Sequence, residues 1–475
     1  MAAIAALALH GLSGCAKSPV SLIPPPFSTN NLIQQENAKP GSNAWVIPTG
    51  NIASNHQIEG YASANSVNRG ESISFFVSTA DPSFKLEVFR LGWYQGNGAR
   101  LVASNTLAGG LQAPCSTDAT TLVINCAWQS SSTLQLPAPE ADGTNNWTSG
   151  IYLAKLTGST SNKSSYIPFV VRDDARKAEI RFASAMNTWE AYNEWGGTSL
   201  YTTPRAFKVS FNRPFFRGTG GGDLVSELWE MSALRFLERE GYDVSYAADV
   251  DALNASELLN HKVLLFPGHH EYWSTPMRDN VQAAINAGVH AVFFGSNNVY
   301  WQVRYEADAT GAPNRVMVCY KSTQDPMATT NPPLTTVQFR EPPVNSPEET
   351  MLGVMFNSAG VDANLVVSNP SHWIFDQTGA SKGQSLGAYL GEEVDGQSGL
   401  APPGTTVLME SPYVSSGGSS GISRTTIFQA PSGAFVFSSG TSNFPLGLDN
   451  IHTNDANPVI IQMVRNLLAH LGATR

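Results

Sequence analysis

The chain has 475 residues, of which 42% are hydrophobic and 14% charged, and its formal net charge is −10 at pH 7. This length exceeds the usual size of one hydrophobic core, so two domains are expected, and the composition is that of a globular chain rather than a disordered one. The negative charge, with no cluster of Lys and Arg in the sequence, argues against nucleic acid as a partner.

The N-terminus reads AAIAALALHGLSGCAKSP, an apolar stretch that ends in small residues before Cys15. This spacing is typical of a bacterial lipoprotein cleavage site with Cys15 as the lipidated residue, although no basic residue precedes Lys17. The stretch is too short to span a bilayer as a helix. We therefore expect a lipoprotein-type signal over residues 1–15 and an exported protein, periplasmic or at the cell surface, anchored to the membrane only through its N-terminal lipid.

Residues 16–50 are rich in Pro, Ser and Asn and are expected to form a linker. Between residues 51 and 174, runs such as ESISFFVST and SFKLEVFRLGW alternate apolar and polar residues and are separated by Gly, Asn, Ser and Asp. This pattern is typical of an all-β domain, an immunoglobulin-like β-sandwich. Cys115 and Cys126 flank a short polar loop and could form a disulfide in an exported protein, whereas Cys319 is expected to be a buried free thiol.

From residue 175 to residue 475, helical and strand patterns alternate. DLVSELWEMSALRFLEREG has apolar residues at helical spacing and ends in Gly241, and the strand KVLLFPG, the helix TPMRDNVQAAINAG and the strand VHAVFFGSN follow. The alternation predicts an α/β domain with a mainly parallel sheet. Ligands of such sheets bind beyond the carboxyl ends of the strands, where Glu271 and Asn297 follow two successive apolar runs.

Polar and aromatic residues gather in PGHHEYWS, where His269 and Glu271 share one face of an extended chain. HEYWS begins like the zinc-protease motif H-E-x-x-H, but Ser274 stands where the second histidine must be, which excludes that motif. NTWEAYNEWGGTSLY contains Tyr192, which would have to point the same way as Glu271 to act with it. An aromatic-packed turn is the alternative interpretation of this stretch.

Two glycine-rich stretches match functional motifs only superficially. GTGGGD, residues 218–223, lacks the Lys-Ser/Thr of a phosphate-binding loop, and GGSSG, residues 417–421, lacks the strand and helix of a serine-hydrolase elbow. Both are expected to be loops.

Several segments together resemble the large (beta) subunit of N,N-dimethylformamidase and its relatives, namely FRLGWYQGNGAR, NTWEAYNEWGG, EREGYDVSYAADVD, PGHHEYWS and FFGSNNVYWQVRYE. The resemblance implies a β-rich domain joined to an α/β domain of glutamine-amidotransferase-like shape. It also implies a mononuclear non-haem iron with two tyrosinates and one glutamate as ligands, which are Tyr152, Tyr192 and Glu271 in this sequence. For Tyr152, which shares its strand face with Ala154 and Leu156, a core tyrosine is the alternative. The catalytic residues that the resemblance implies are His269, Asn297, Lys321 and Glu410.

Two phenolates and a carboxylate are hard, anionic oxygen ligands that suit ferric iron better than zinc, and the iron would act as a Lewis acid. We therefore expect an exported, iron-dependent hydrolase that cleaves the C–N bond of a small-molecule amide. The alternative is a non-catalytic, carbohydrate-binding surface lipoprotein in which aromatic side chains stack on sugar rings, the candidates being Trp189, Trp195, Tyr272 and Trp273. Homo-oligomerisation stays open at this point.

Overall fold

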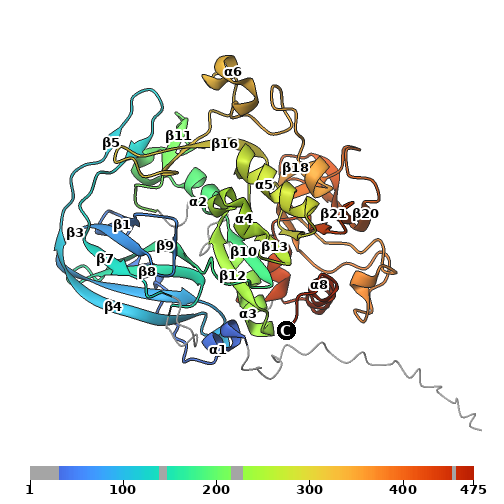
Figure 1. The fold of residues 1–475 in the computed structure, drawn as a ribbon, viewed down its shortest axis with the longest axis horizontal. Coiled ribbons are helices and arrows are strands. Elements are labelled where there is room, and N and C mark those ends of the chain that lie inside the picture. The colour runs from blue at the N-terminus through green and yellow to red at the C-terminus, as the bar shows by residue number, and fades with distance from the viewer. Residues whose placement is uncertain (1–30, 139–146, 216–227, 452–455) are drawn as a thin grey trace, which may run out of the picture.

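The computed structural model describes residues 31–138, 147–215, 228–451 and 456–475. It is a mixed α/β protein with substantial strand content, built around two large sheets that lie side by side (Figure 1). The predicted signal with Cys15, the linker up to residue 30 and the GTGGGD stretch lie outside the described residues. Within the described ranges, no helix has both the length and the apolar character needed to cross a membrane.

The first sheet has seven strands in the order β1-β3-β8-β9-β2, with β4 and β7 also paired to β3. The two runs predicted as separate strands form one long strand, β3, in which a register shift between Thr79 and Ser83 accommodates Pro82. The first half of β3 pairs with β1 and β7, and the second half pairs with β4 and β8. All seven strands thus share one hydrogen-bonded network, and the immunoglobulin-like arrangement stays a prediction. The strands are β1 (Ile58–Ala62), β2 (Ser66–Asn68), β3 (Ser72–Leu91), β4 (Ala99–Gly110), β7 (Ser132–Gln135), β8 (Gly150–Gly158) and β9 (Ser164–Arg172).

The second sheet has the order β12-β10-β13-β15-β22-β21-β20. The first five strands pair in parallel, and β21 pairs antiparallel with both β22 and β20. This confirms the predicted mainly parallel sheet. The amidotransferase-like shape stays a prediction. The strands are β10 (Ile180–Ser184), β12 (Val244–Ala248), β13 (Val263–Pro267), β15 (His290–Phe294), β20 (Thr406–Val414), β21 (Ser420–Gln429) and β22 (Phe435–Ser438). The GGSSG stretch lies at the turn between β20 and β21.

Three smaller sheets complete the strand content. Two of them, the four-stranded sheet β11-β17-β16-β14 and the pair β18-β19, reach the candidate site, and the pair β5-β6 forms a short hairpin. Their strands are β5 (Ser116–Thr117), β6 (Ile124–Asn125), β11 (Lys208–Ser210), β14 (Tyr272–Ser274), β16 (Trp301–Glu306), β17 (Val316–Val318), β18 (Met355–Ala363) and β19 (Leu390–Gly396).

The predicted helices are present with the expected end signals. α3 (Trp229–Glu240) stops at Gly241, whose φ of 81° is left-handed and therefore favours glycine. The Ser274 side chain accepts a hydrogen bond from the backbone at the start of α5 (Thr275–Asn286). The other helices are α1 (Leu32–Asn37), α2 (Met186–Tyr192), α4 (Ala255–Leu258), α6 (Met327–Thr330), α7 (Glu349–Leu352) and α8 (Pro458–His470).

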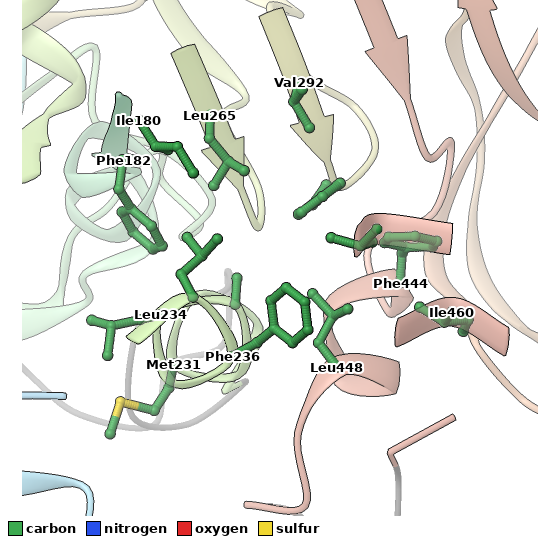
Figure 2. Packing of buried hydrophobic residues seen from close by; sticks show 14 of the residues in the cluster. Ile180, Phe182, Met231, Leu234, Phe236, Leu265, Val292, Phe444, Leu448 and Ile460 are labelled. Atoms are coloured by element: carbon green, nitrogen blue, oxygen red, sulfur yellow. The ribbon is translucent and has the colours of Figure 1, made fainter. Parts of the chain in front are cut away.

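The main core lies between α3 and the parallel sheet (Figure 2). Leu234 and Phe236 of α3 are fully buried, as are Phe182 of β10 and Leu265 of β13. Burying one such side chain contributes about 1.5–3 kcal/mol, so this packing fixes the sheet whose strand ends carry the site.

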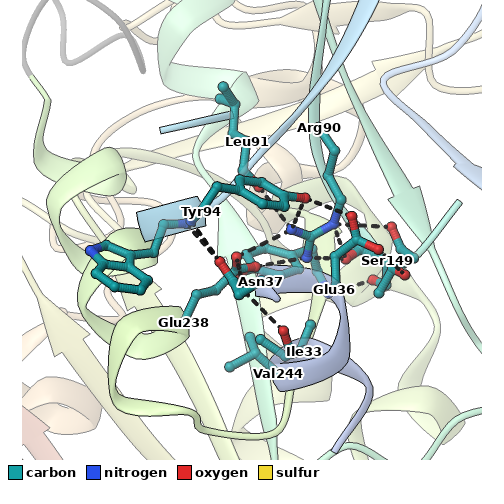
Figure 3. Close-up of polar contacts among 12 residues, drawn as sticks. Ile33, Glu36, Asn37, Arg90, Leu91, Tyr94, Ser149, Glu238 and Val244 are labelled. Carbon is teal, nitrogen blue, oxygen red and sulfur yellow. Dashed lines mark hydrogen bonds and ion pairs between the residues drawn. The ribbon is translucent and has the colours of Figure 1, made fainter. Parts of the chain in front are cut away.

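A buried ion network joins the two large sheets and α1 (Figure 3). Arg90 of β3 donates to Glu238 of α3 at 2.7 Å, and Arg100 of β4 donates to Glu36 of α1 at 2.6 Å. Burial alone would raise the pKa of the Glu36 carboxyl, but the Arg90 and Arg100 guanidinium groups offset it and lower the pKa to about 2. Since removing one partner would leave an uncompensated buried charge, the network holds α1, the first sheet and α3 in one arrangement.

Candidate active site

Two neighbouring strand ends build the centre of the site. β13 and β15 are parallel, and the turns that follow them carry His269 to Glu271 and Ser296 to Asn298. The turns approach so closely that a Cβ at Gly295 would lie 1.7 Å from the Gly268 carbonyl oxygen, so only glycine fits there. The Trp301 backbone N–H donates to the Glu271 carbonyl at 2.9 Å and ties the second turn to the first.

Phenol groups and one carboxylate converge beside these turns. The Tyr201 hydroxyl lies 2.8 Å and 3.0 Å from the two carboxylate oxygens of Glu271, and the Tyr272 hydroxyl donates to the Tyr201 hydroxyl at 2.5 Å. Tyr192, the last residue of α2, stacks on the Tyr201 ring with 4.0 Å between centroids, and its hydroxyl lies close enough to Tyr201 and Glu271 for both to shift its pKa. Tyr192 and Glu271 therefore meet, as the sequence predicted.

The electrostatics of this cluster suit a cation. Burial, together with the negative charge of Glu271, raises the pKa of the Tyr192, Tyr201 and Tyr272 phenols well above the ordinary value of 10. Burial likewise raises the pKa of the Glu271 carboxyl. A metal ion at the meeting point would supply the positive charge that phenolates and a carboxylate need in a buried place.

The donor set fits ferric iron. The Tyr201 hydroxyl lies within hydrogen-bonding distance of both the Glu271 carboxylate and the Tyr272 hydroxyl. Phenol and carboxylate oxygens are the hard ligands that a trivalent iron prefers. Within the described part of the chain, no three His, Cys, Asp or Glu side chains are grouped to hold a metal.

His269 lies next to the cluster between two carboxylates. Its Nε2 is 2.9 Å from Oε2 of Glu393 on β19 and 3.6 Å from Oε2 of Glu271. Burial lowers the pKa of the imidazole, but the negative charges of Glu393, Glu271 and Asp395 together outweigh burial and raise the pKa to about 9. Because both neighbours of Nε2 are carboxylates, a proton on this nitrogen would be well placed to be passed on.

Asn297 is held rigidly beside Glu393. Its backbone N–H donates to Oδ1 of Asp395 at 2.8 Å, its φ of 52° is left-handed, and its side chain lies beside the Glu393 carboxylate. The neighbouring Ser296 hydroxyl donates to the Glu393 carbonyl at 2.6 Å. β19 thus positions both the turn after β15 and the carboxylate partner of His269.

Lys321 closes the site from the side of β17. Its ammonium lies 3.6 Å from the centroid of the Tyr201 ring and 4.9 Å from that of Trp301. Burial lowers the pKa of this amine to about 8. Tyr201 is 41% exposed although its hydroxyl meets the buried Glu271, so its ring is part of the solvent-facing wall of the site.

Two predicted residues are not brought to the site. Tyr152 lies on β8 inside the first sheet's core, where its ring stacks between Trp147 and Phe169 and its hydroxyl donates to the Thr148 carbonyl at 2.6 Å. Every residue from Gly150 to Ala154 is buried, so the alternation of faces in the sequence did not distinguish a core tyrosine from a ligand.

Glu410 alternates on β20 with the buried Met409 and Ser411, so it faces solvent and pairs with Arg424 at 3.2 Å. The glutamate that reaches His269 is Glu393 instead.

Tyr201, Glu393 and a contributing role for Tyr272 were not predicted from the sequence. Tyr201 lies only nine positions after Tyr192 in the same aromatic stretch, but it sits in a loop whose path no periodicity reveals. Glu393 and Asp395 are two apart on one strand and share a face, which is the pattern that could have indicated them.

The fold and the site define a mixed α/β protein with a tyrosine and glutamate cluster at the strand ends of its parallel sheet. A family model described as "N,N-dimethylformamidase beta subunit-like, C-terminal" matches residues 85–457. The chain belongs to this family. No curated protein matches it.

Similar solved structures are remote. A thua-like protein from Bacteroides uniformis is 10% identical with a TM-score of 0.29, covering 50% of this chain and 84% of that one. An alkylpurine DNA glycosylase from Pseudomonas fluorescens, bound to DNA, is 12% identical with a TM-score of 0.15, covering 26% and 32%. Neither likeness is close enough to bear on the fold or the function.

Proposed function

We propose that the protein is an exported hydrolase that cleaves the C–N bond of a small-molecule amide with a mononuclear ferric iron. The observation that carries this proposal is the convergence of the Tyr192 and Tyr201 hydroxyls on the Glu271 carboxylate. Membership of the dimethylformamidase-like family supports amides as the substrate class. Export and the lipid on Cys15 rest on the N-terminal sequence alone.

In this proposal Tyr192, Tyr201 and Glu271 hold the iron, and Tyr272 donates a hydrogen bond to the Tyr201 oxygen. A ferric iron bound by these residues would supply Lewis acidity toward an amide carbonyl. Tyr201 replaces Tyr152 as the second tyrosine ligand because Tyr152 is enclosed in the core of the first sheet.

The remaining residues handle the proton and the substrate. Water adds to the amide carbon, the C–N bond breaks, and the departing nitrogen needs a proton to leave as an amine. His269 Nε2 holds such a proton between Glu393 and Glu271. Asn297 orients Glu393 and the substrate, and Lys321 provides a positive charge at the opposite wall.

No observation favours the carbohydrate-binding alternative. Three of its four rings, Trp189, Tyr272 and Trp273, are at most 3% exposed and therefore cannot stack on a sugar.

Amine release tests the proposal. The mature protein, loaded with ferric iron, should release amine from N,N-dimethylformamide or simpler formamides, and His269→Ala should lower kcat by a factor of about 100 or more, the range of general acid–base catalysis. The proposal fails if the iron-loaded protein releases no amine from a panel of small amides, or if His269→Ala leaves the rate unchanged.

A further inference from the structure

A disulfide-closed hairpin, residues 115–126, contacts the segment that carries Tyr201. Cys115 and Cys126 are bonded, as the sequence predicted, and between them β5 pairs with β6. Asp118 shapes the tip, because its carboxylate accepts hydrogen bonds from the backbone N–H groups of Thr120 and Thr121. Among the cysteines that the structure describes, the free one is Cys319, which is buried, also as predicted.

The hairpin tip holds both ends of the Tyr201 loop, residues 198–207. The Thr198 hydroxyl donates to the Leu122 carbonyl at 3.0 Å, and the Phe207 backbone N–H donates to the Thr121 carbonyl at 2.8 Å. The loop contains no helix or strand of its own. Two adjacent carbonyls of the hairpin therefore fix the two points between which the loop carries Tyr201.

The base of the hairpin continues this contact. The Cys126 backbone N–H donates to the Asn212 carbonyl at 2.8 Å, and the Ser210 hydroxyl donates to Asn125 at 2.8 Å. One end of the disulfide is thus itself bonded to the strand segment that follows the loop.

Apolar packing joins the hairpin to the site. Leu122 packs in the cluster that contains Leu200, Tyr192 and Tyr272. A Cβ at Gly196 would lie 2.5 Å from Cδ1 of Ile124, so the hairpin also fits closely against the chain between Tyr192 and Tyr201.

We propose that the Cys115–Cys126 hairpin is a positioning element for Tyr201, so that an intact disulfide keeps the Tyr201 hydroxyl at the Glu271 carboxylate. This inference rests on the proposed function only where it makes Tyr201 a metal ligand. Among the described residues, those outside the hairpin hydrogen-bond only to the carbonyl groups of the two loop ends, since Arg213 donates to the Thr198 carbonyl at 2.7 Å and the Cys319 backbone N–H donates to the Phe207 carbonyl at 2.9 Å. The Thr198 hydroxyl and the Phe207 backbone N–H donate to the hairpin. Opening the disulfide lets the hairpin adopt many more conformations, and the loop ends lose their fixed acceptors.

Hydrogen exchange of the metal-free protein tests this placement. A dithiol reductant converts the Cys115–Cys126 bond into two thiols while it closes to its own cyclic disulfide, and the double variant Cys115→Ser/Cys126→Ser gives the same open hairpin without reductant. In both, amides of residues 198–207 should exchange faster by roughly a factor of ten or more. Amides of the β8–β9 pair should exchange as in the oxidised protein.

A matched pair of variants separates positioning from general stability. Thr198→Val removes the hydroxyl that donates to Leu122 and should reproduce part of the faster exchange, whereas Thr198→Ser should restore the oxidised pattern. Thr133→Ala serves as the control, because it removes an exposed hydrogen bond with Ser74 within the first sheet. It should leave the exchange rates of residues 198–207 unchanged.

Iron provides the second readout. The disulfide-free double variant should bind ferric iron with a phenolate absorption band at least severalfold weaker than that of the oxidised protein, without any reductant that would attack the metal. Unchanged exchange at residues 198–207, or equal acceleration throughout the first sheet, would overturn the positioning role. If the oxidised protein itself shows no phenolate band, the proposed iron site fails, while the exchange experiment still decides the role of the hairpin.

Discussion

At the scale of single residues, Tyr201 and Tyr152 are the two candidates for the second tyrosine ligand of the proposed iron site, and their hydroxyls have different partners. The Tyr201 hydroxyl donates to the Glu271 carboxylate, whereas the Tyr152 hydroxyl donates to the Thr148 backbone carbonyl inside the core of the first sheet. Phenylalanine keeps the ring and removes the hydroxyl in both cases, so the same substitution separates a ligand from a packing residue.

Tyr201→Phe should abolish most of the phenolate-to-iron absorption and lower amidase activity by at least about 100-fold, because it removes a ligand of the proposed iron site. Tyr152→Phe should keep both and lower the free energy of unfolding by about 1 kcal/mol, the usual value of one hydrogen bond. Visible spectra, rates and urea unfolding of the two variants check this. If Tyr152→Phe instead loses the absorption and the activity while Tyr201→Phe keeps both, Tyr152 is the ligand and Tyr201 is not.

The two glutamates form a second matched pair. Glu393→Gln removes the negative charge next to Nε2 of His269 and should lower kcat by about 10- to 100-fold with little change in iron content. Glu410→Gln breaks only an exposed pair with Arg424 and should change neither by more than about twofold. Steady-state rates and metal analysis give the readout. A large loss of activity in Glu410→Gln would contradict a site that contains Glu393 and not Glu410.

At the scale of elements, α3 and the parallel strands determine where the site lies. Leu234→Ala in α3 should lower the free energy of unfolding by about 2–5 kcal/mol, because it opens a cavity against the sheet. Denaturant unfolding measures this, and Leu259→Ala, at a residue that is 53% exposed, is the control and should cost less than about 1 kcal/mol. Comparable losses in the two variants would contradict the packing shown in Figure 2.

Elements with a strong local pattern were predictable from the sequence, and so was the centre of the site. The α3 and α5 helices and the β13 and β15 strands follow apolar periodicity with clear end signals, and parallel strands bring Glu271 and Asn297 to one edge. β3 was predicted as two strands because Asp81-Pro82 resembles a break, yet pairing with four different neighbours carries the strand through it.

What the sequence did not determine is set by long-range packing. Tyr201 reaches Glu271 across 70 positions through a loop without periodicity, and Glu393 reaches His269 from a strand 124 positions away. Neither contact leaves a local trace in the residues around it. Of the residues that the family resemblance implied, Tyr152 and Glu410 lie away from the cluster, and Tyr201 and Glu393 are the tyrosine and the glutamate that lie in it.

At the scale of the whole molecule, the network around Glu36 makes stability depend on pH. The pKa of Glu36 is about 2 in the folded protein and 4.5 ordinarily, so its contribution is complete above about pH 4.5 and is lost as the pH falls towards 2. This difference corresponds to about 3 kcal/mol.

Between pH 4.5 and 2 the free energy of unfolding should therefore fall more steeply for the wild-type protein than for Glu36→Gln. Glu306→Gln, at an exposed pair with Lys208, should follow the wild type. Unfolding curves at a series of pH values check this, and parallel pH profiles for wild type and Glu36→Gln would rule out the role given to the network.

Iron content and visible absorption of the purified mature protein test the tyrosine and glutamate site most directly. The wild type, loaded with ferric iron, should hold about one iron per chain and show a phenolate-to-iron band, and both should be lost in Glu271→Gln while the fold persists. A wild-type protein that stays colourless and free of iron after loading, or a Glu271→Gln variant that keeps iron and colour, would contradict the site.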